Sequence, residues 1–130
     1  MYDKVDYWLE LCEDDLLTAK ALLTSNRLLH MGFFCNMVAE KAFKAAIAKN
    51  TDEIPPRIHD LQRLATFGGI FHDLSESQLA TLDKLAPMQI QARYPEYKAR
   101  IEATLTVEYC TQLLSETEDL LCWIKAQLGK

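Results

Sequence analysis

Three groups of polar side chains have the residue types needed to bind a ligand or to transfer a proton. They are Glu40, Lys41 and Lys44 within a long apolar segment; Arg57, His59 and Asp60 after the Pro55-Pro56 pair; and Arg93, Tyr94 and Tyr97 around Pro95. Arginine can bind phosphate through two parallel hydrogen bonds, and tyrosine can stack on a base and donate its hydroxyl group. If folding brings these groups together, they would form a site for a nucleotide or an RNA backbone.

Each group also has a purely structural interpretation. Glu40 and Lys41 can pair with charged side chains of neighbouring helices. His59 can cap a helix or pack in the core, and Arg93 can bind the carbonyl groups that end a helix. Only burial or a perturbed environment would favour the functional interpretation.

Other kinds of chemistry lack their usual sequence patterns. None of the three histidines, His30, His59 and His72, has a glutamate three residues before it, as a two-iron helical bundle requires. The four cysteines form no closely spaced pair that would bind zinc. The Gly68-Gly69 pair lacks the pattern of a phosphate-binding loop, and no segment resembles a nucleophile turn. We therefore expect no metal site, no cofactor and no catalytic residue of these kinds.

The first polar group lies on a segment whose residues strongly favour a helix. Residues 36–47 contain neither glycine nor proline, and apolar residues recur at intervals of three and four from Met31 to Ala45. This pattern predicts a helix from about Arg27 to Lys49, preceded by another from about Asp3 to Leu23. The connection between them is short, which predicts antiparallel packing. We expect the acidic cluster at residues 13–15 to face solvent.

Prolines, glycines and capping residues divide the rest of the chain. The pattern predicts a short helix at 57–67 with Pro56 in its first turn, and a fourth helix with a capping box from Ser75 to Gln78. Pro87 should kink or end that fourth helix. A last helix is expected from about Lys98 or Thr104 to Gln127. The sequence thus predicts one all-α domain spanning residues 1–130, an up-and-down antiparallel bundle of four long helices and a short one.

Composition narrows the classes of partner. The chain has 130 residues and a net charge of −5, which argues against DNA binding through a broad basic surface, and we expect no sequence-specific DNA partner. A local basic pocket for a nucleotide or RNA is compatible with this charge. The cysteines lie on or beside apolar stripes, which predicts buried free thiols. With no signal peptide and no apolar run of membrane-spanning length, we expect a cytoplasmic protein without a membrane partner.

The order and spacing of several segments resemble those of one helical family. The segments are Asp15-Leu16 with Ala19 and Leu22; Phe34-Cys35; Ala39-Glu40-Lys41-Ala42 with Lys44-Ala45; His59-Asp60-Leu61 with Leu64; and Ala92-Arg93-Tyr94-Pro95. Together they resemble a HEPN domain over essentially the whole chain. The resemblance implies a helical bundle that forms a homodimer with a cleft at the interface. It also implies a role beside a separate minimal nucleotidyltransferase, as in toxin–antitoxin or nucleotide-handling pairs.

The chain departs from the signature of HEPN proteins that are metal-independent ribonucleases. That signature is an arginine followed, after four to six residues, by a histidine. Counting from Arg93, the histidine positions hold Lys98, Ala99 and Arg100. Without an imidazole to take the proton of the ribose 2′-hydroxyl, that mechanism loses a main contributor. The absence of this histidine therefore argues against an enzyme.

Our leading hypothesis is a non-catalytic HEPN module that dimerises and binds a minimal nucleotidyltransferase, a nucleotide, or both. In it Arg93 holds phosphate, Tyr94 or Tyr97 stacks on the base, and Lys41 and Lys44 supply positive potential, with His59 as a further binding candidate. One alternative is a ribonuclease toxin in which Arg93 works with a substitute base such as His59. Another is a structural helical adaptor whose polar groups are caps.

Overall fold

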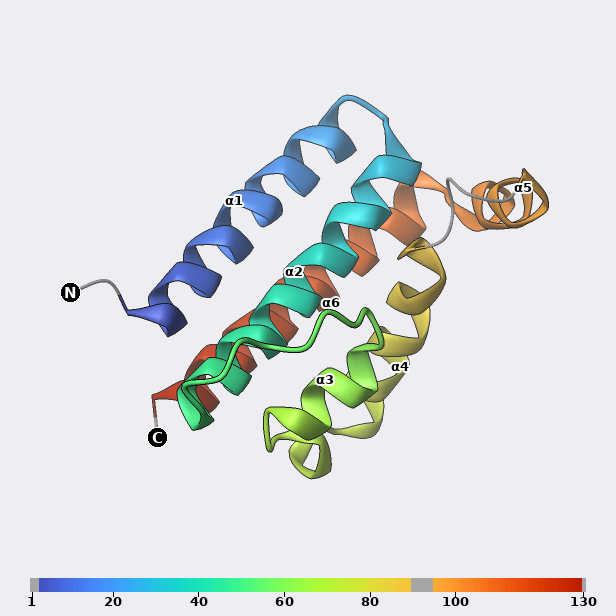
Figure 1. Cartoon of the computed structure of the whole chain (residues 1–130). Coiled ribbons are helices and arrows are strands. Elements are labelled where there is room, and N and C mark those ends of the chain that lie inside the picture. The colour runs from blue at the N-terminus through green and yellow to red at the C-terminus, as the bar shows by residue number, and fades with distance from the viewer. Residues whose placement is uncertain (1–2, 90–94, 130) are drawn as a thin grey trace.

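Three long helices lie side by side and form the body of the molecule (Figure 1). The computed structural model describes residues 3–89 and 95–129, except for the side chains of Pro95 and Tyr97. The long helices are α1 (Lys4–Thr24), α2 (Leu28–Asn50) and α6 (Val107–Leu128). The shorter helices are α3 (Leu61–Phe67), α4 (Glu76–Leu85) and α5 (Pro95–Thr104), with 3₁₀ turns η1 (Phe71–Asp73) and η2 (Ala86–Gln89). Helix α2 therefore has α1 on one side and α3 and α4 on the other.

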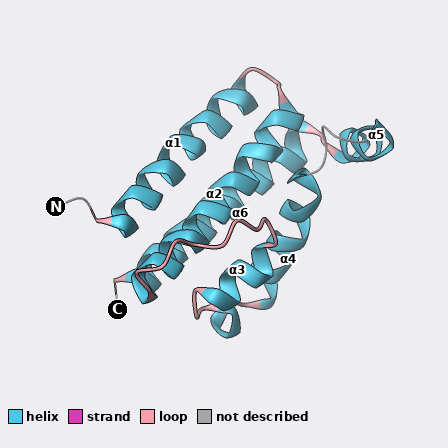
Figure 2. Ribbon diagram, viewed as in Figure 1, coloured by secondary structure: helices cyan, strands magenta, loops and turns pink. Residues whose placement is uncertain are grey.

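The all-α prediction is confirmed, because every described residue belongs to a helix, a 3₁₀ turn or a loop (Figure 2). Helix α1 begins after Asp3, whose side chain accepts a hydrogen bond from the Val5 N–H. The chain reverses into α2 at Asn26, which has a φ of 62°. Asparagine tolerates this left-handed conformation better than most residues, so the short turn gives the antiparallel pair that the sequence predicted.

Helix α2 supplies the largest share of the buried core. Small side chains alternate with large ones along it, so neighbouring helices approach closely on more than one side. Its fully or almost fully buried apolar residues are Met31, Cys35, Val38, Ala39, Ala42, Phe43, Ala45, Ala46 and Ile47. Gly32 permits one of the close approaches, because a Cβ atom there would lie 2.7 Å from Sδ of Met88. This contact holds η2 against α2.

Local signals fix the limits of α4. Ser75 and Gln78 form the expected capping box, with each side chain bonded to the backbone of the other residue. The α-helix ends at Leu85, and the chain continues as a 3₁₀ turn through Pro87. The prediction that Pro87 would end the helix early is confirmed, because a proline in the helix interior removes a donor and clashes with the preceding turn.

Two predicted helix boundaries were wrong. The third helix begins at Leu61 and not at Arg57, because the Asp60 side chain accepts from the Arg63 N–H and caps it there. Pro56 is thus outside the first turn. The last helix divides into α5 and α6, since Thr106 caps the second of them. The bundle therefore contains three long and three shorter α-helices among its described residues, where four long and one short were expected.

Two predictions about burial also need correction. Asp15, expected to face solvent, is buried, because its carboxylate pairs with Lys41 across the α1–α2 interface. Cys122 is exposed, whereas Cys12, Cys35 and Cys110 are buried as free thiols. Burial, with a smaller contribution from Asp15, raises the pKa of the Cys12 thiol to about 12. Among the described residues, no helix combines the length and apolar character needed to cross a membrane.

Candidate functional site

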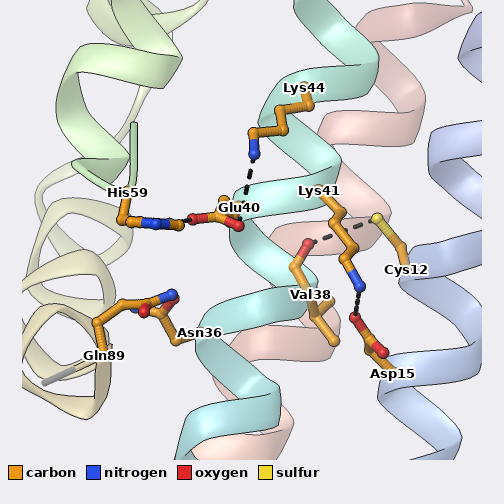
Figure 3. Close-up of polar contacts among 9 residues, drawn as sticks. All are labelled: Cys12, Asp15, Asn36, Val38, Glu40, Lys41, Lys44, His59 and Gln89. Atoms are coloured by element: carbon orange, nitrogen blue, oxygen red, sulfur yellow. Dashed lines mark hydrogen bonds and ion pairs between the residues drawn. The ribbon is translucent and has the colours of Figure 1, made fainter. Parts of the chain in front are cut away.

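Helix α2 carries a row of polar side chains toward α3 and α4, although most of its surface is apolar. Asn36, Glu40 and Lys44 are spaced four residues apart, which places them on one face of the helix. Lys41 points to the other side, toward α1 (Figure 3). The row meets the loop that contains His59 and the end of η2, and these two segments complete the candidate site.

Glu40 is the centre of this row. Its side chain is only 4% exposed, and its carboxylate accepts a hydrogen bond from Nδ1 of His59. Nζ of Lys44 lies 3.6 Å from its second oxygen and also lies 5.5 Å from the centre of the Trp8 ring. A buried carboxylate is costly unless it is paired and hydrogen-bonded. Here both oxygens have partners, so the charge of Glu40 is compensated inside the bundle.

The contact with Glu40 determines how His59 presents its ring. A carboxylate only accepts hydrogen bonds, so Nδ1 of His59 carries the proton. In the neutral ring, Nε2 then has a free lone pair. Within the described part of the chain, Nε2 has no hydrogen-bond partner, and the side chain is 62% exposed. The imidazole is thus fixed on one side and available on the other.

His59 lines a groove of about 430 Å³, whose walls are its own loop with the start of α3 on one side and the α4–η2 segment on the other. We call this the His59 groove; its polar lining residues include Asp60, Asp83 and Gln89. Neither lysine nor arginine is among its described lining residues. Its carboxylates and amide groups therefore suit hydroxyl and amino groups, such as those of a nucleoside, better than they suit phosphate.

A buried asparagine positions Gln89 at the edge of this groove. Asn36 is fully buried, donates to the carbonyl of Leu85 at 2.8 Å, and accepts from Nε2 of Gln89 at 2.7 Å. Both ends of its amide are therefore used. This pair of bonds ties the end of α4 and the η2 turn to α2; Asn36 and Gln89 lie beside each other in Figure 3.

The structure brings some of the predicted site residues together and separates others. His59 and Lys44 meet at Glu40. Lys41 is apart from them and donates to Asp15 at 2.5 Å, so the Asp15 carboxylate compensates its charge within the α1–α2 interface. Arg93 and Tyr94 lie outside the described residues. Tyr97 lies in the first turn of α5, but its side chain is also outside the described part.

Sequence reasoning gave Glu40 no role as the centre of the site and missed Asn36, Asp83 and Gln89. For Asn36 there was a usable signal, because an amide at a core-facing position of an apolar helix needs a buried partner. Asp83 and Gln89 gave no comparable signal. Among the described residues, no group of three or more histidine, cysteine or acidic side chains could hold a metal ion.

Comparison with known proteins gives two similarities. A family model described as the HEPN domain matches residues 5–127. The crystal structure of ST0689, an archaeal HEPN homologue, is similar with a TM-score of 0.67 and 20% sequence identity, over 98% of this chain and 99% of that one. No curated protein matches. At this identity the structural similarity establishes the fold, while the family match extends over nearly the whole chain.

Proposed function

The chain belongs to the HEPN domain family, and we propose that it is a non-catalytic HEPN module that dimerises, binds a nucleotide and pairs with a minimal nucleotidyltransferase. HEPN domains commonly dimerise, which supports the first part of this proposal. The nucleotide part rests on the site, and specifically on the His59–Glu40 pair. We assign the nucleoside portion of the ligand to the His59 groove.

The fixed imidazole of His59 carries the proposal. The residue lines a groove of about 430 Å³, within the range of about 300–1,000 Å³ that small-ligand sites usually have. Asp60 and Asp83 can accept hydrogen bonds from ribose hydroxyls or base amino groups, and Gln89 can both donate and accept. These groups would bind the nucleoside part of a nucleotide, and none of them would neutralise the charge of its phosphate.

We assign the phosphate to Arg93. Arg93 is four positions after Gln89 in the sequence, which limits the distance between their Cα atoms to about 14 Å. A guanidinium group binds phosphate through two parallel hydrogen bonds, and Tyr94 or Tyr97 would stack on the base. Lys41 and Lys44 have carboxylate partners in the bundle, so we give them a supporting role through their potential only.

Isothermal calorimetry tests the binding part with two sets of probes, the four nucleoside monophosphates and the matching nucleosides. We expect His59→Ala to weaken both sets by about tenfold, since one hydrogen bond is lost. Arg93→Ala should weaken the monophosphates and leave the nucleosides unchanged. His72→Ala is the matched control, because His72 is exposed and lies outside the groove. Absence of heat with every probe would refute the nucleotide proposal.

The partner part needs a separate test. Light scattering on the purified chain measures its mass, and a monomer at micromolar concentration would contradict the dimer. Co-expression with a minimal nucleotidyltransferase from a neighbouring gene, followed by size-exclusion chromatography, tests the pairing. We expect the two chains to elute together.

The same His59–Glu40 geometry favours a second candidate, a metal-independent ribonuclease. A carboxylate that fixes the imidazole tautomer is the arrangement that lets histidine accept a proton, here from a ribose 2′-hydroxyl. His59 would then replace the histidine absent from positions 98–100. RNA cleavage that persists with a chelator and is lost in His59→Ala would support this candidate. Cleavage that survives in both His59→Ala and Arg93→Ala would exclude this site. If the chain neither cleaves RNA nor binds a nucleotide, the structural adaptor is the function that remains.

A further inference from the structure

The loop that leads from the end of α2 into α3 presents an apolar surface to solvent (Figure 1). Ile54, in this loop, is 83% exposed, and Phe67, at the end of α3, is 53% exposed. Both belong to a hollow of about 280 Å³. Its lining residues, which we call the Ile54 patch, are Ile47, Thr51, Glu53, Ile54, Pro56 and Phe67.

The exposure of these two side chains points to a contact with another protein. Large apolar side chains gain stability when they leave water, yet Ile54 is the most exposed of them in the described part of the chain. Phe67 lies in the same hollow and does not cover it. Exposed apolar side chains that lie together and have charged residues at their rim are typical of protein–protein interaction sites.

The patch contains both a projecting side chain and a hollow that can receive one. Ile54 is almost free of neighbours, and the hollow beside it has apolar walls from Pro56 and Phe67. When two copies of a chain meet about a twofold axis, each patch faces its own image. Ile54 of each copy can then enter the hollow of the other. A different protein would need a hollow or a projection to match, but not both within one patch.

The charges of the patch are complementary in the same way. Glu53 is part of the lining, and Cζ of Arg63 lies 6.0 Å from the centre of the Phe67 ring. Both side chains are exposed, and neither has an ion pair within the described part of the chain. About a twofold axis, Glu53 of each copy can pair with Arg63 of the other.

Net charge also favours a balanced patch for such a contact. The chain carries a net charge of −5, so two copies repel each other over much of their surface. Glu53 and Arg63 cancel each other, so a contact between copies at this patch adds no repulsion of its own.

From these features we propose that the Ile54 patch joins two copies of the chain in an isologous contact. Ile54 of each copy fills the hollow of the other, and Glu53 pairs with Arg63 at both edges. The proposal rests on the dimerisation proposed above and adds the surface that makes the contact. It is independent of the nucleotide site, because the patch shares no lining residue with the His59 groove.

Sedimentation velocity over a dilution series tests the patch, because it measures the mass of the assembly. The variant is Ile54→Asp, which places an unpaired charge at the centre of the apolar contact. The matched control is Leu17→Asp, since Leu17 is 64% exposed and lies outside the patch. We expect Ile54→Asp to halve the mass at concentrations at which the unmodified chain and the control remain associated. Circular dichroism confirms that both variants are folded.

Charge reversal tests whether the contact is complementary to itself. Glu53→Arg and Arg63→Glu each place like charges against each other twice, so either variant alone should associate at least about tenfold more weakly. When the two variants are mixed, both pairs again have opposite charges. We expect the mixed dimer to form with an affinity within about threefold of the original.

The results distinguish this proposal from the dimerisation on which it rests. An unmodified chain that is monomeric at micromolar concentration would refute both. An assembly that keeps its mass in Ile54→Asp would refute the patch alone and would leave its apolar surface to a different protein. Mixed charge variants that associate no better than either variant by itself would refute the isologous contact.

Discussion

Replacement of Glu40 by glutamine tests whether this buried carboxylate holds the candidate site together. Glutamine keeps the size and one carbonyl oxygen but removes the charge. The bond from Nδ1 of His59 then loses its charge assistance, which costs about 1 kcal/mol. The ammonium of Lys44, whose side chain is only 12% exposed, loses its partner at 3.6 Å, which costs about 1 kcal/mol more. We expect a total loss of about 2 kcal/mol in unfolding free energy.

Urea unfolding followed by far-UV circular dichroism measures this loss directly. For a chain of 130 residues, an unfolding entropy of about 2.1 cal/mol/K per residue converts it to a fall in Tm of about 7 °C. Glu118→Gln is the matched control, because Glu118 pairs with Lys20 and both side chains are more than 40% exposed. An exposed pair of this kind contributes about 0–1 kcal/mol, so the control should change little.

A double-mutant cycle separates the histidine bond from the rest of the effect. We expect Glu40→Gln and His59→Ala to be non-additive by about 1 kcal/mol, because each removes the same contact. If Glu40→Gln costs no more than Glu118→Gln, the carboxylate does not hold the site, and the argument for an oriented His59 fails. Additivity of the two changes would refute the contact itself.

Three further predictions concern other parts of the fold. Asn36→Leu should cost about 2 kcal/mol in urea unfolding, because it leaves the buried carbonyl of Leu85 and the part-buried amide of Gln89 without their partner. Gly68→Ala should cost about 1–3 kcal/mol, since the new Cβ would lie 2.9 Å from that of Ala46, whereas Gly129→Ala, with 3.6 Å to its nearest neighbour, should be nearly neutral. Unfolding free energy should fall as pH rises above about 9, because the unfolded Cys12 thiol ionises there while the folded one keeps its proton to about 12. Below pH 9 this contribution is fully present, and in Cys12→Ala the decline with pH should be shallower by up to about 1.4 kcal/mol per pH unit.

Much of the helical framework could be predicted because its signals are local. The apolar spacing of α2 and the capping box from Ser75 to Gln78 each depend on residues within two turns of one another. The errors arose where two local signals competed. Pro56 and Asp60 both fit the start of a helix, and the hydrogen bond that Asp60 accepts determined the start that the chain adopts.

The candidate site was predicted only in part, because its contacts join residues that are far apart in sequence. The sequence placed Glu40, Lys41 and Lys44 together on one predicted helix, and it named His59 as a candidate. It could not indicate that His59 donates to Glu40, nor that Lys41 turns to Asp15 instead. Each of these partners comes from a different segment, and spacing along the chain contains no information about which segments meet.

The amino-acid sequence by itself determined an all-α chain, with most helix limits set by caps, prolines and the apolar period, since these act over a few residues. Tertiary structure decided which charged side chains pair with one another within the bundle and which remain unpaired at the surface. Packing of α1 and of the His59 loop against α2 supplies partners for Lys41 and Glu40. Among the described residues, the side chains of Arg27 and Lys98 have no such partner; Lys98 lies on α5, which extends away from the bundle (Figure 1).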